Sequence, residues 1–327
     1  MSKVGKLAFR LMLLMLLVVC CCGCFGAGER EIKLKSSELF AVNDQICTRQ
    51  ELLIFLLTQK LKYESSYGAD IWTAQLEDGS FEDYVREALL HYMETLFLVY
   101  DAAAQAGIAL SNIELEAVRK SADGYLAAFD PETRQSLGID RAVVEMAYTR
   151  YMMADIYYRQ ITQRASMEIS EEEARAMLVQ IIEVPGALGM ETARAIADAI
   201  GSGAGEAGAI APHESVTTRR ETIVRGSYGE AFDTLVFSLP KDAFSPVINT
   251  GESYYIVKCI SSYVEEATLT NKLRMEEEIR ESAFHDRISE HAANLTVSFN
   301  TPLWDSIRMS DYRELQGPDF YAYLPQQ

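Results

Sequence analysis

The chain has 327 residues, of which 49% are hydrophobic, and a formal net charge of −18. This length is enough for two domains, and the apolar content is enough for a packed core. Because so acidic a surface repels phosphate backbones, we expect no nucleic-acid partner. Residues 1–23 hold three cations and no acid, so a chain that begins at Cys24 would carry −21.

The first 23 residues have the pattern of a secretory signal. A positive segment comes first, an unbroken apolar run follows over residues 11–19, and Gly23-Cys24 forms a small-residue site. The apolar run is too short for a comfortable membrane span, so it is typical of a signal rather than of a transmembrane helix. Residues 1–23 are therefore excluded from the fold.

Gly23 followed by Cys24 predicts a lipoprotein signal, in which Cys24 becomes the lipid-modified first residue. Cys20 and Cys21 are alternative attachment sites. In the simpler interpretation, all these cysteines are soft apolar residues of a signal that is discarded.

A mature chain keeps only Cys47 and Cys259 besides the anchor. Their apolar surroundings predict two buried free thiols, and a single disulfide bridge remains the alternative. No histidine pair has the spacing of a metal site, and no cysteine–histidine set suggests zinc. We expect neither a metal nor a cofactor. The four histidines are His91, His213, His285 and His291.

A helical domain is expected over residues 37–167, after a polar tether over 24–36. Residues 42–46 predict a short strand broken by an Asn-Asp turn. Thr48 and Glu51 form a capping-box pattern that begins a helix. Apolar residues at helical spacing predict further helices. These helices are expected over residues 81–107, from after Ser111-Asn112 to about 129, and over 140–166.

The last of these helices carries a stripe of methionine and tyrosine. Two interpretations are open: ordinary packing between helices, which is the more common outcome at this spacing, or an adaptable cleft for unfolded segments. The stripe consists of Met146, Tyr148, Tyr151, Met152, Met153, Tyr157 and Tyr158.

A second domain is expected over residues 168–263. Ser170 predicts a helix cap, residues 178–184 a strand, and residues 190–200 a helix. The stretch 201–224 gives no clear assignment. Beyond residue 263, the spacing predicts one charged helix over 269–295 and then a strand over 295–299.

Residues 225–258 resemble the C-terminal half of a parvulin-type peptidyl-prolyl isomerase domain, almost without gaps. The opening of the helical domain resembles the chaperone domain of PrsA-type and SurA-type foldases, where a short strand leads into a helix with an early Glu. The residues that match the parvulin pattern are Arg225-Gly226, Phe232, Phe237, Leu239, Ser245-Pro246-Val247, Thr250, Tyr254 and Ile256-Val257-Lys258.

The resemblance implies an α+β fold: a SurA-like helical chaperone domain that is discontinuous, with an inserted parvulin-like α/β domain. In these foldases the chain returns to the helical domain after the parvulin domain, so residues 264–327 are expected to complete it.

The resemblance also assigns a candidate site. Tyr228 stands where the proline pocket usually has Met, while Phe232 and Phe237 match its aromatic positions. Gln180 and Tyr255 stand at the two positions where the family carries its facing histidines. Glutamine and tyrosine can both hydrogen-bond, so they could hold a similar network without an imidazole.

Two functional interpretations follow. One is an active prolyl isomerase, and the other is a chaperone that has kept the fold with weak or absent isomerase activity. A third is an envelope lipoprotein that scaffolds one folded partner. The resemblance implies unfolded secreted proteins as partners, a lipid anchor on the outer face of the cytoplasmic membrane, and allows a dimer.

Overall fold

The computed structural model describes residues 32–165, 168–202 and 215–325. The predicted signal, Cys24 and the first part of the tether lie outside the described residues, as does His213. The chain divides into two compact units. We call residues 1–165 with 281–327 unit 1, and residues 166–280 unit 2. The α+β class expected from the sequence is confirmed.

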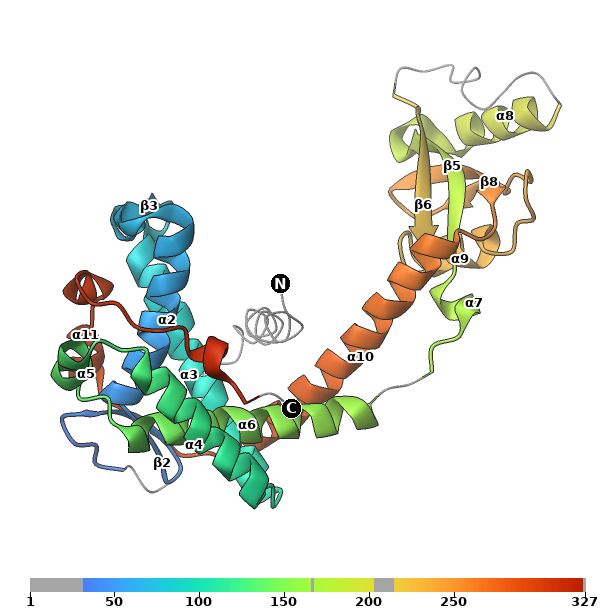
Figure 1. Cartoon of the computed structure of the whole chain (residues 1–327). Helices are drawn as coiled ribbons and strands as arrows, with labels where there is room; N and C mark the ends of the chain where they lie inside the picture. Colours follow the sequence, from blue (N-terminus) through green and yellow to red (C-terminus); the bar gives the residue numbers. More distant parts are fainter. Residues whose placement is uncertain (1–31, 166–167, 203–214, 326–327) are drawn as a thin grey trace. The chain divides into compact units, whose positions relative to one another are not determined.

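Unit 1 is mainly helical (Figure 1). Its long helices pack around one apolar core, and two distant stretches of the chain share its sheet. The helices are α2 (Arg49–Tyr67), α3 (Phe81–Gln105), α4 (Asn112–Ala127), α5 (Pro131–Leu137), α6 (Arg141–Arg164) and α11 (Thr301–Asp305), with short 3-10 turns η2 (Ala69–Thr73), η4 (Met309–Tyr312) and η5 (Phe320–Tyr323). The strands are β1 (Glu38–Val42), β2 (Gln45–Thr48), β3 (Gln75–Leu76), β4 (Gly79–Ser80) and β9 (Val297–Phe299).

The sheet of β2, β1 and β9 joins the two ends of unit 1. The expected broken strand is a hairpin of β1 and β2, with Asn43 at the turn in a left-handed conformation (φ 48°) that asparagine tolerates. On its other side β1 pairs with β9, where Ala41 lies opposite Ser298. The C-terminal strand is therefore part of the same unit as the N-terminal hairpin.

The cap of α2 differs from the expected capping box. The hydroxyl of Thr48 accepts the backbone N–H of Glu51 at 3.2 Å, as predicted. The Glu51 carboxylate, however, accepts a hydrogen bond from Arg150 of α6, and both side chains are buried. The guanidinium also lies 4.2 Å from the ring centre of Phe97. The buried pair thus joins α2, α3 and α6.

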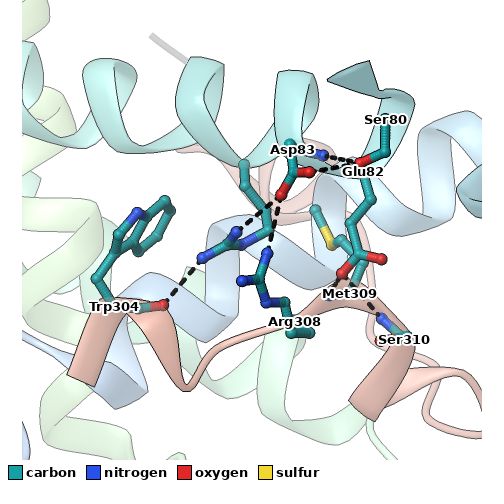
Figure 2. Close-up of polar contacts among 8 residues, drawn as sticks. Ser80, Glu82, Asp83, Trp304, Arg308, Met309 and Ser310 are labelled. Atoms are coloured by element: carbon teal, nitrogen blue, oxygen red, sulfur yellow. Dashed lines mark hydrogen bonds and ion pairs between the residues drawn. The ribbon is translucent and has the colours of Figure 1, made fainter. Parts of the chain in front are cut away.

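The N-terminus of α3 holds the C-terminal stretch in place (Figure 2). Asp83 accepts hydrogen bonds from Arg86 at 3.2 Å and from Arg308 at 2.8 Å. Arg86 also donates to the carbonyl of Trp304 at 2.9 Å, and Glu82 accepts the backbone N–H of Met309 at 2.6 Å. Carboxylates at a helix N-terminus suit the helix dipole, so this contact serves both the cap and the return of the chain.

The methionine and tyrosine stripe of α6 belongs to the core. Tyr148 is fully buried and stacks on Phe320 with ring centres 4.3 Å apart. Of the stripe, only Met146 is exposed, at 43%. This geometry favours the packing interpretation over an open cleft.

Unit 2 is built on an antiparallel sheet in the order β6, β5, β8, β7. Apolar side chains of α8 cover one face, and those of α9 cover the other. The strands are β5 (Ala176–Pro185), β6 (Thr217–Val224), β7 (Ile248–Asn249) and β8 (Ser253–Ser261), and the helices are α7 (Glu171–Ala174), α8 (Gly189–Gly201) and α9 (Glu230–Val236), with the 3-10 turn η3 (Gly186–Leu188).

Helix α10 (Glu265–Ala292) begins four residues before its expected start and ends three residues before its expected end. Its first turns are fixed to the beginning of β5. The Thr268 hydroxyl accepts the N–H of Ala176 at 3.0 Å, and the Asn271 amide donates to the carbonyl of Ala174 at 2.9 Å. These bonds satisfy backbone groups that would otherwise be buried without partners.

Candidate functional site

Three aromatic rings form the candidate site on the α9 face of the sheet in unit 2. Tyr228 stacks on Phe232 with ring centres 4.5 Å apart and an angle of 26° between the planes. Tyr255 of β8 meets both rings edge-on, at 5.5 Å from Tyr228 and 5.9 Å from Phe232. The structure thus brings together three of the five residues that the sequence singled out.

Local backbone geometry places Tyr228 above Phe232. Gly226 and Gly229 flank the tyrosine with φ angles of 86° and 89°, in a region that glycine enters at little steric cost. The N–H of Gly226 is held at 2.6 Å by the carboxylate of Asp233. A tight turn therefore places the Tyr228 ring against the first turn of α9.

Phe232 is fully buried. A pocket that accepts a pyrrolidine ring must expose its aromatic wall, and here the rings of Tyr228 and Tyr255 cover that wall. A proline side chain could reach Phe232 only after Tyr228 has moved away. The residue that the sequence assigns to the pocket is therefore core in this conformation.

A ring of charged groups restrains Tyr228. Its hydroxyl accepts a hydrogen bond from Arg219 at 2.9 Å and donates to Glu221 at 2.7 Å. Arg219 also donates to Glu183 at 2.7 Å. Glu183 accepts the hydroxyl of Tyr255 at 3.3 Å. Both tyrosine hydroxyls are therefore tied into one network on the sheet.

The pKa shifts in this network keep Glu183, Arg219 and both tyrosines in their ordinary charge states. Hydrogen bonding by Arg219 lowers the pKa of Glu183. Burial raises the pKa of Tyr228 and of Tyr255, so both phenols stay protonated. The pKa of Arg219 is raised, first by its hydrogen bond to Tyr228 and then by that to Glu183. The network supplies a fixed ion pair and two neutral phenols, rather than an acid–base couple that titrates near neutral pH.

Gln180 does not face Tyr255. In the register of β5 and β8, Gln180 lies opposite Lys258, whereas Tyr255 lies opposite Glu183. Side chains alternate between the faces of a strand, so Gln180 shares the α8 face with Ile182. The two expected histidine-equivalent positions therefore do not form a facing pair, and Glu183 is the β5 partner of Tyr255.

Phe237 belongs to the same apolar cluster as Phe232 and is 4% exposed. The guanidinium of Arg225 lies 4.5 Å from its ring centre, and that of Arg175 lies 5.6 Å from it. Phe237 is therefore surrounded like a core residue, with two guanidinium groups packed near its ring. The geometry thus favours a core position for Phe237 over a contact with substrate.

The sequence analysis missed Glu183, Arg219 and Glu221. One signal was available, because Glu183 is the one charged residue of the strand predicted over residues 178–184. Arg219 and Glu221 lie in the stretch that received no assignment, and only the pairing of β6 with β5 brings them beside Glu183.

The remaining side-chain predictions concern thiols and metals. Cys47 and Cys259 are free and buried, as expected. Within the described ranges, no group of three or more His, Cys, Asp or Glu side chains is placed to hold a metal ion. Among the helices of those same ranges, none is both long and apolar enough to cross a bilayer.

Comparison with known proteins gives matches at the level of structure. No protein-family model matches the chain, and no curated protein matches it significantly. PrsA from Bacillus cereus is 13% identical, with 74% of this chain and 97% of that one covered and a TM-score of 0.35. A SurA-like chaperone of Campylobacter jejuni is 12% identical, with coverage of 81% and 99% and a TM-score of 0.30. PrsA from Bacillus subtilis is 15% identical, with coverage of 69% and 93% and a TM-score of 0.23. The Bacillus cereus protein is described as a peptidylprolyl isomerase, and the Campylobacter jejuni protein as a SurA-like chaperone.

Proposed function

We propose that the chain is an extracytoplasmic foldase that assists the folding of secreted proteins, and that its parvulin-like unit binds client segments with weak or absent peptidyl-prolyl isomerase activity. A lipid on Cys24 would hold it at the outer face of the cytoplasmic membrane. The parvulin-like motif over residues 225–258 and the signal at residues 1–24 support the class of protein.

One observation carries the proposal of weak or absent activity: Phe232 is fully buried beneath Tyr228. Rotation about a prolyl bond has an intrinsic barrier of about 18–20 kcal/mol, and no covalent bond breaks. A catalyst must therefore take the ring into an apolar pocket and favour the twisted amide. The closed aromatic cluster offers no such pocket, and the network of Arg219 and Glu183 opposes the movement that would open it.

The same geometry is compatible with a binding role. A client segment can be held by surface contacts alone, without entry of a proline ring. The acidic net charge of the chain keeps it soluble beside aggregation-prone clients. The scaffold alternative differs in one respect: it requires tight binding to one folded protein rather than weak binding to many unfolded ones.

The test combines two assays on the soluble chain that lacks residues 1–24. A protease-coupled assay measures prolyl isomerisation, and light scattering measures the aggregation of a reduced, unfolded client. We expect suppressed aggregation with isomerisation close to the uncatalysed rate. Substantial catalysis that disappears when the Tyr228 ring is cross-linked or otherwise immobilised would show that the cluster opens during turnover, and would refute the proposal.

A pair of substitutions provides a matched control for the closed pocket. Tyr228→Met with Tyr255→His restores the residues that the parvulin resemblance places at these positions. We expect this double variant to gain isomerase activity over the wild type, because the thioether leaves Phe232 uncovered. Equal activity in both proteins would mean that the aromatic closure is not what limits catalysis.

A further inference from the structure

Unit 2 has a second candidate binding surface away from the aromatic cluster. A groove of about 530 Å³ lies between β6 and the first turns of α10. Val224 contributes from the strand, Ala267 from the helix and Val264 from the residue just before the helix, so apolar groups line it on both sides. We call this feature the β6–α10 groove.

Two exposed leucines border the groove. Leu269 is 58% exposed and Leu273 is 57% exposed, one helical turn apart on α10. Residues at i and i+4 lie on the same side of a helix, so the two side chains form one apolar stripe. On the helix surface this stripe adjoins the groove-lining positions Glu266 and Thr270.

The strand that contributes to the groove lies at the edge of its sheet. β6 is the end strand of its sheet, and on its outer side no strand of the described ranges pairs with it (Figure 1). Every other residue of an edge strand directs its backbone N–H and C=O groups outward. Such an edge recognises one kind of ligand in particular, a segment in extended conformation that continues the ladder.

Charge adds a further constraint on the ligand. Glu266 lines the groove and takes part in no ion pair within the described residues. The other charged residue of the groove, Arg274, already bonds to Glu278 and Asn271. A cationic side chain on the ligand would therefore find an available carboxylate at Glu266.

The geometry points to the β6–α10 groove as a binding site for an extended, unfolded polypeptide segment. The bound segment adds a strand to β6 and places alternate apolar side chains against Leu269 and Leu273. A basic residue of the segment lies against Glu266. The inference rests on the proposed function, since it names the surface by which unit 2 holds a client while the aromatic cluster stays closed. Pairing through the backbone is largely independent of sequence, which suits a protein with many clients.

The probe is a fluorescein-labelled peptide of alternating valine and threonine with a lysine at each end. Its binding to the soluble chain is measured by fluorescence anisotropy. We expect Leu269→Asp with Leu273→Asp to raise the Kd about tenfold or more. Leu235→Asp is the matched control, because Leu235 is a 36%-exposed leucine of the same unit that lies on α9 rather than on α10. An unchanged Kd in the double variant would overturn the inference.

Two further measurements distinguish strand addition from nonspecific hydrophobic binding. Glu266→Lys should weaken binding of the lysine-flanked peptide about twofold to fivefold. A glutamate-flanked peptide should instead bind the Glu266→Lys variant more tightly than it binds the wild type. A peptide with N-methylated alternate residues should not bind, and the normal peptide should slow amide exchange over residues 217–224. Binding that leaves this exchange unchanged would overturn strand addition. Protection of β6 that rises with protein concentration alone would assign the edge to a second copy instead.

The outcomes distinguish this inference from the proposed function. If the wild type fails to suppress client aggregation, the proposed function fails, and the inference fails with it. If the wild type suppresses aggregation and the Leu269→Asp, Leu273→Asp variant does so equally well, only the groove assignment fails. Circular dichroism of each variant confirms that loss of binding does not reflect unfolding.

Discussion

Replacement of Phe232 by alanine tests whether the aromatic cluster is closed in solution. The Phe232 ring is fully buried, with ring contacts to Tyr228 at 4.5 Å and to Tyr255 at 5.9 Å. Truncation of a buried phenylalanine costs about 3–5 kcal/mol, and aromatic pairs add about 0.5–1.5 kcal/mol beyond area burial. We therefore expect Phe232→Ala to lower the stability of unit 2 by about 4 kcal/mol.

The assay must report on unit 2 alone, and the sequence makes this feasible. Both tryptophans, Trp72 and Trp304, lie in unit 1, so their fluorescence in a urea titration follows that unit. Hydrogen exchange at the amides of β5 and β8 follows unit 2. Phe232→Ala should speed exchange in these strands by a factor that corresponds to the lost free energy, and should leave the tryptophan transition in place.

Tyr228→Phe is the matched control, because it keeps the stacked ring and removes only the hydroxyl that bonds to Arg219 and Glu221. Loss of these bonds should cost about 0.5–1.5 kcal/mol, clearly less than the alanine variant. If Phe232→Ala costs under about 1 kcal/mol, the ring does not lie in a packed core. The pocket would then be open, and the argument for weak or absent isomerase activity would fail.

Three other predictions concern unit 1 and the anchor. Burial raises the pKa of Glu94 to about 7 from 4.5, so the folded state binds this proton more tightly and stability is lost as pH rises from about 4.5 to 7. Glu94→Gln should thus raise the free energy of unfolding at pH 8 more than at pH 5, by about 1–2 kcal/mol after screening at this partly exposed site; an equal gain at both pH values would contradict this. Arg150→Met should cost about 3–5 kcal/mol in the tryptophan-monitored transition, because Glu51 stays buried without its cation, and adding Glu51→Leu should recover most of the loss. Cys24→Ser should release the protein from membranes, and a variant that still sediments with them would indicate another attachment site.

Local signals predicted much of the helical structure. Thr48, Ser111 and Ser170 each accept a backbone N–H at the start of a helix, in positions that the sequence indicates. Helix interiors follow from apolar spacing, which depends only on near neighbours. Helix ends were less accurate, as the shifted ends of α10 illustrate, because tertiary bonds such as that from Ala176 to Thr268 decide where the first turn forms.

β6 could not be predicted from its own residues. The strand reads TTRRETIV, and most of its side chains are exposed or half-buried, as befits a sheet edge with charged residues. Its structure depends on pairing with β5, whose residues lie more than 30 positions away in the sequence. Because Arg219 and Glu221 reach the candidate site only through this pairing, the network around Tyr228 was also hidden from sequence analysis.

The position of Gln180 illustrates how strand register limits site prediction. A shift of one residue moves a side chain to the opposite face of a sheet, so a motif match that is correct to within one position can still select the wrong face. The parvulin resemblance aligned Gln180 with a histidine, whereas the register places Glu183 against Tyr255. Tyr255 lies on the α9 face, where its ring meets those of Tyr228 and Phe232.

The substitutions at this site depend on one another. A tyrosine at 228 fills the space over Phe232, but its hydroxyl is half-buried and requires partners, which Arg219 and Glu221 supply. Arg219 in turn requires a carboxylate, which Glu183 supplies while it also accepts the hydroxyl of Tyr255. Replacing Tyr228 alone would leave Arg219 and Glu221 without the hydroxyl that they bond. The closed cluster is therefore best understood as a unit, because the packing over Phe232 and the hydrogen bonds around it depend on the same side chains.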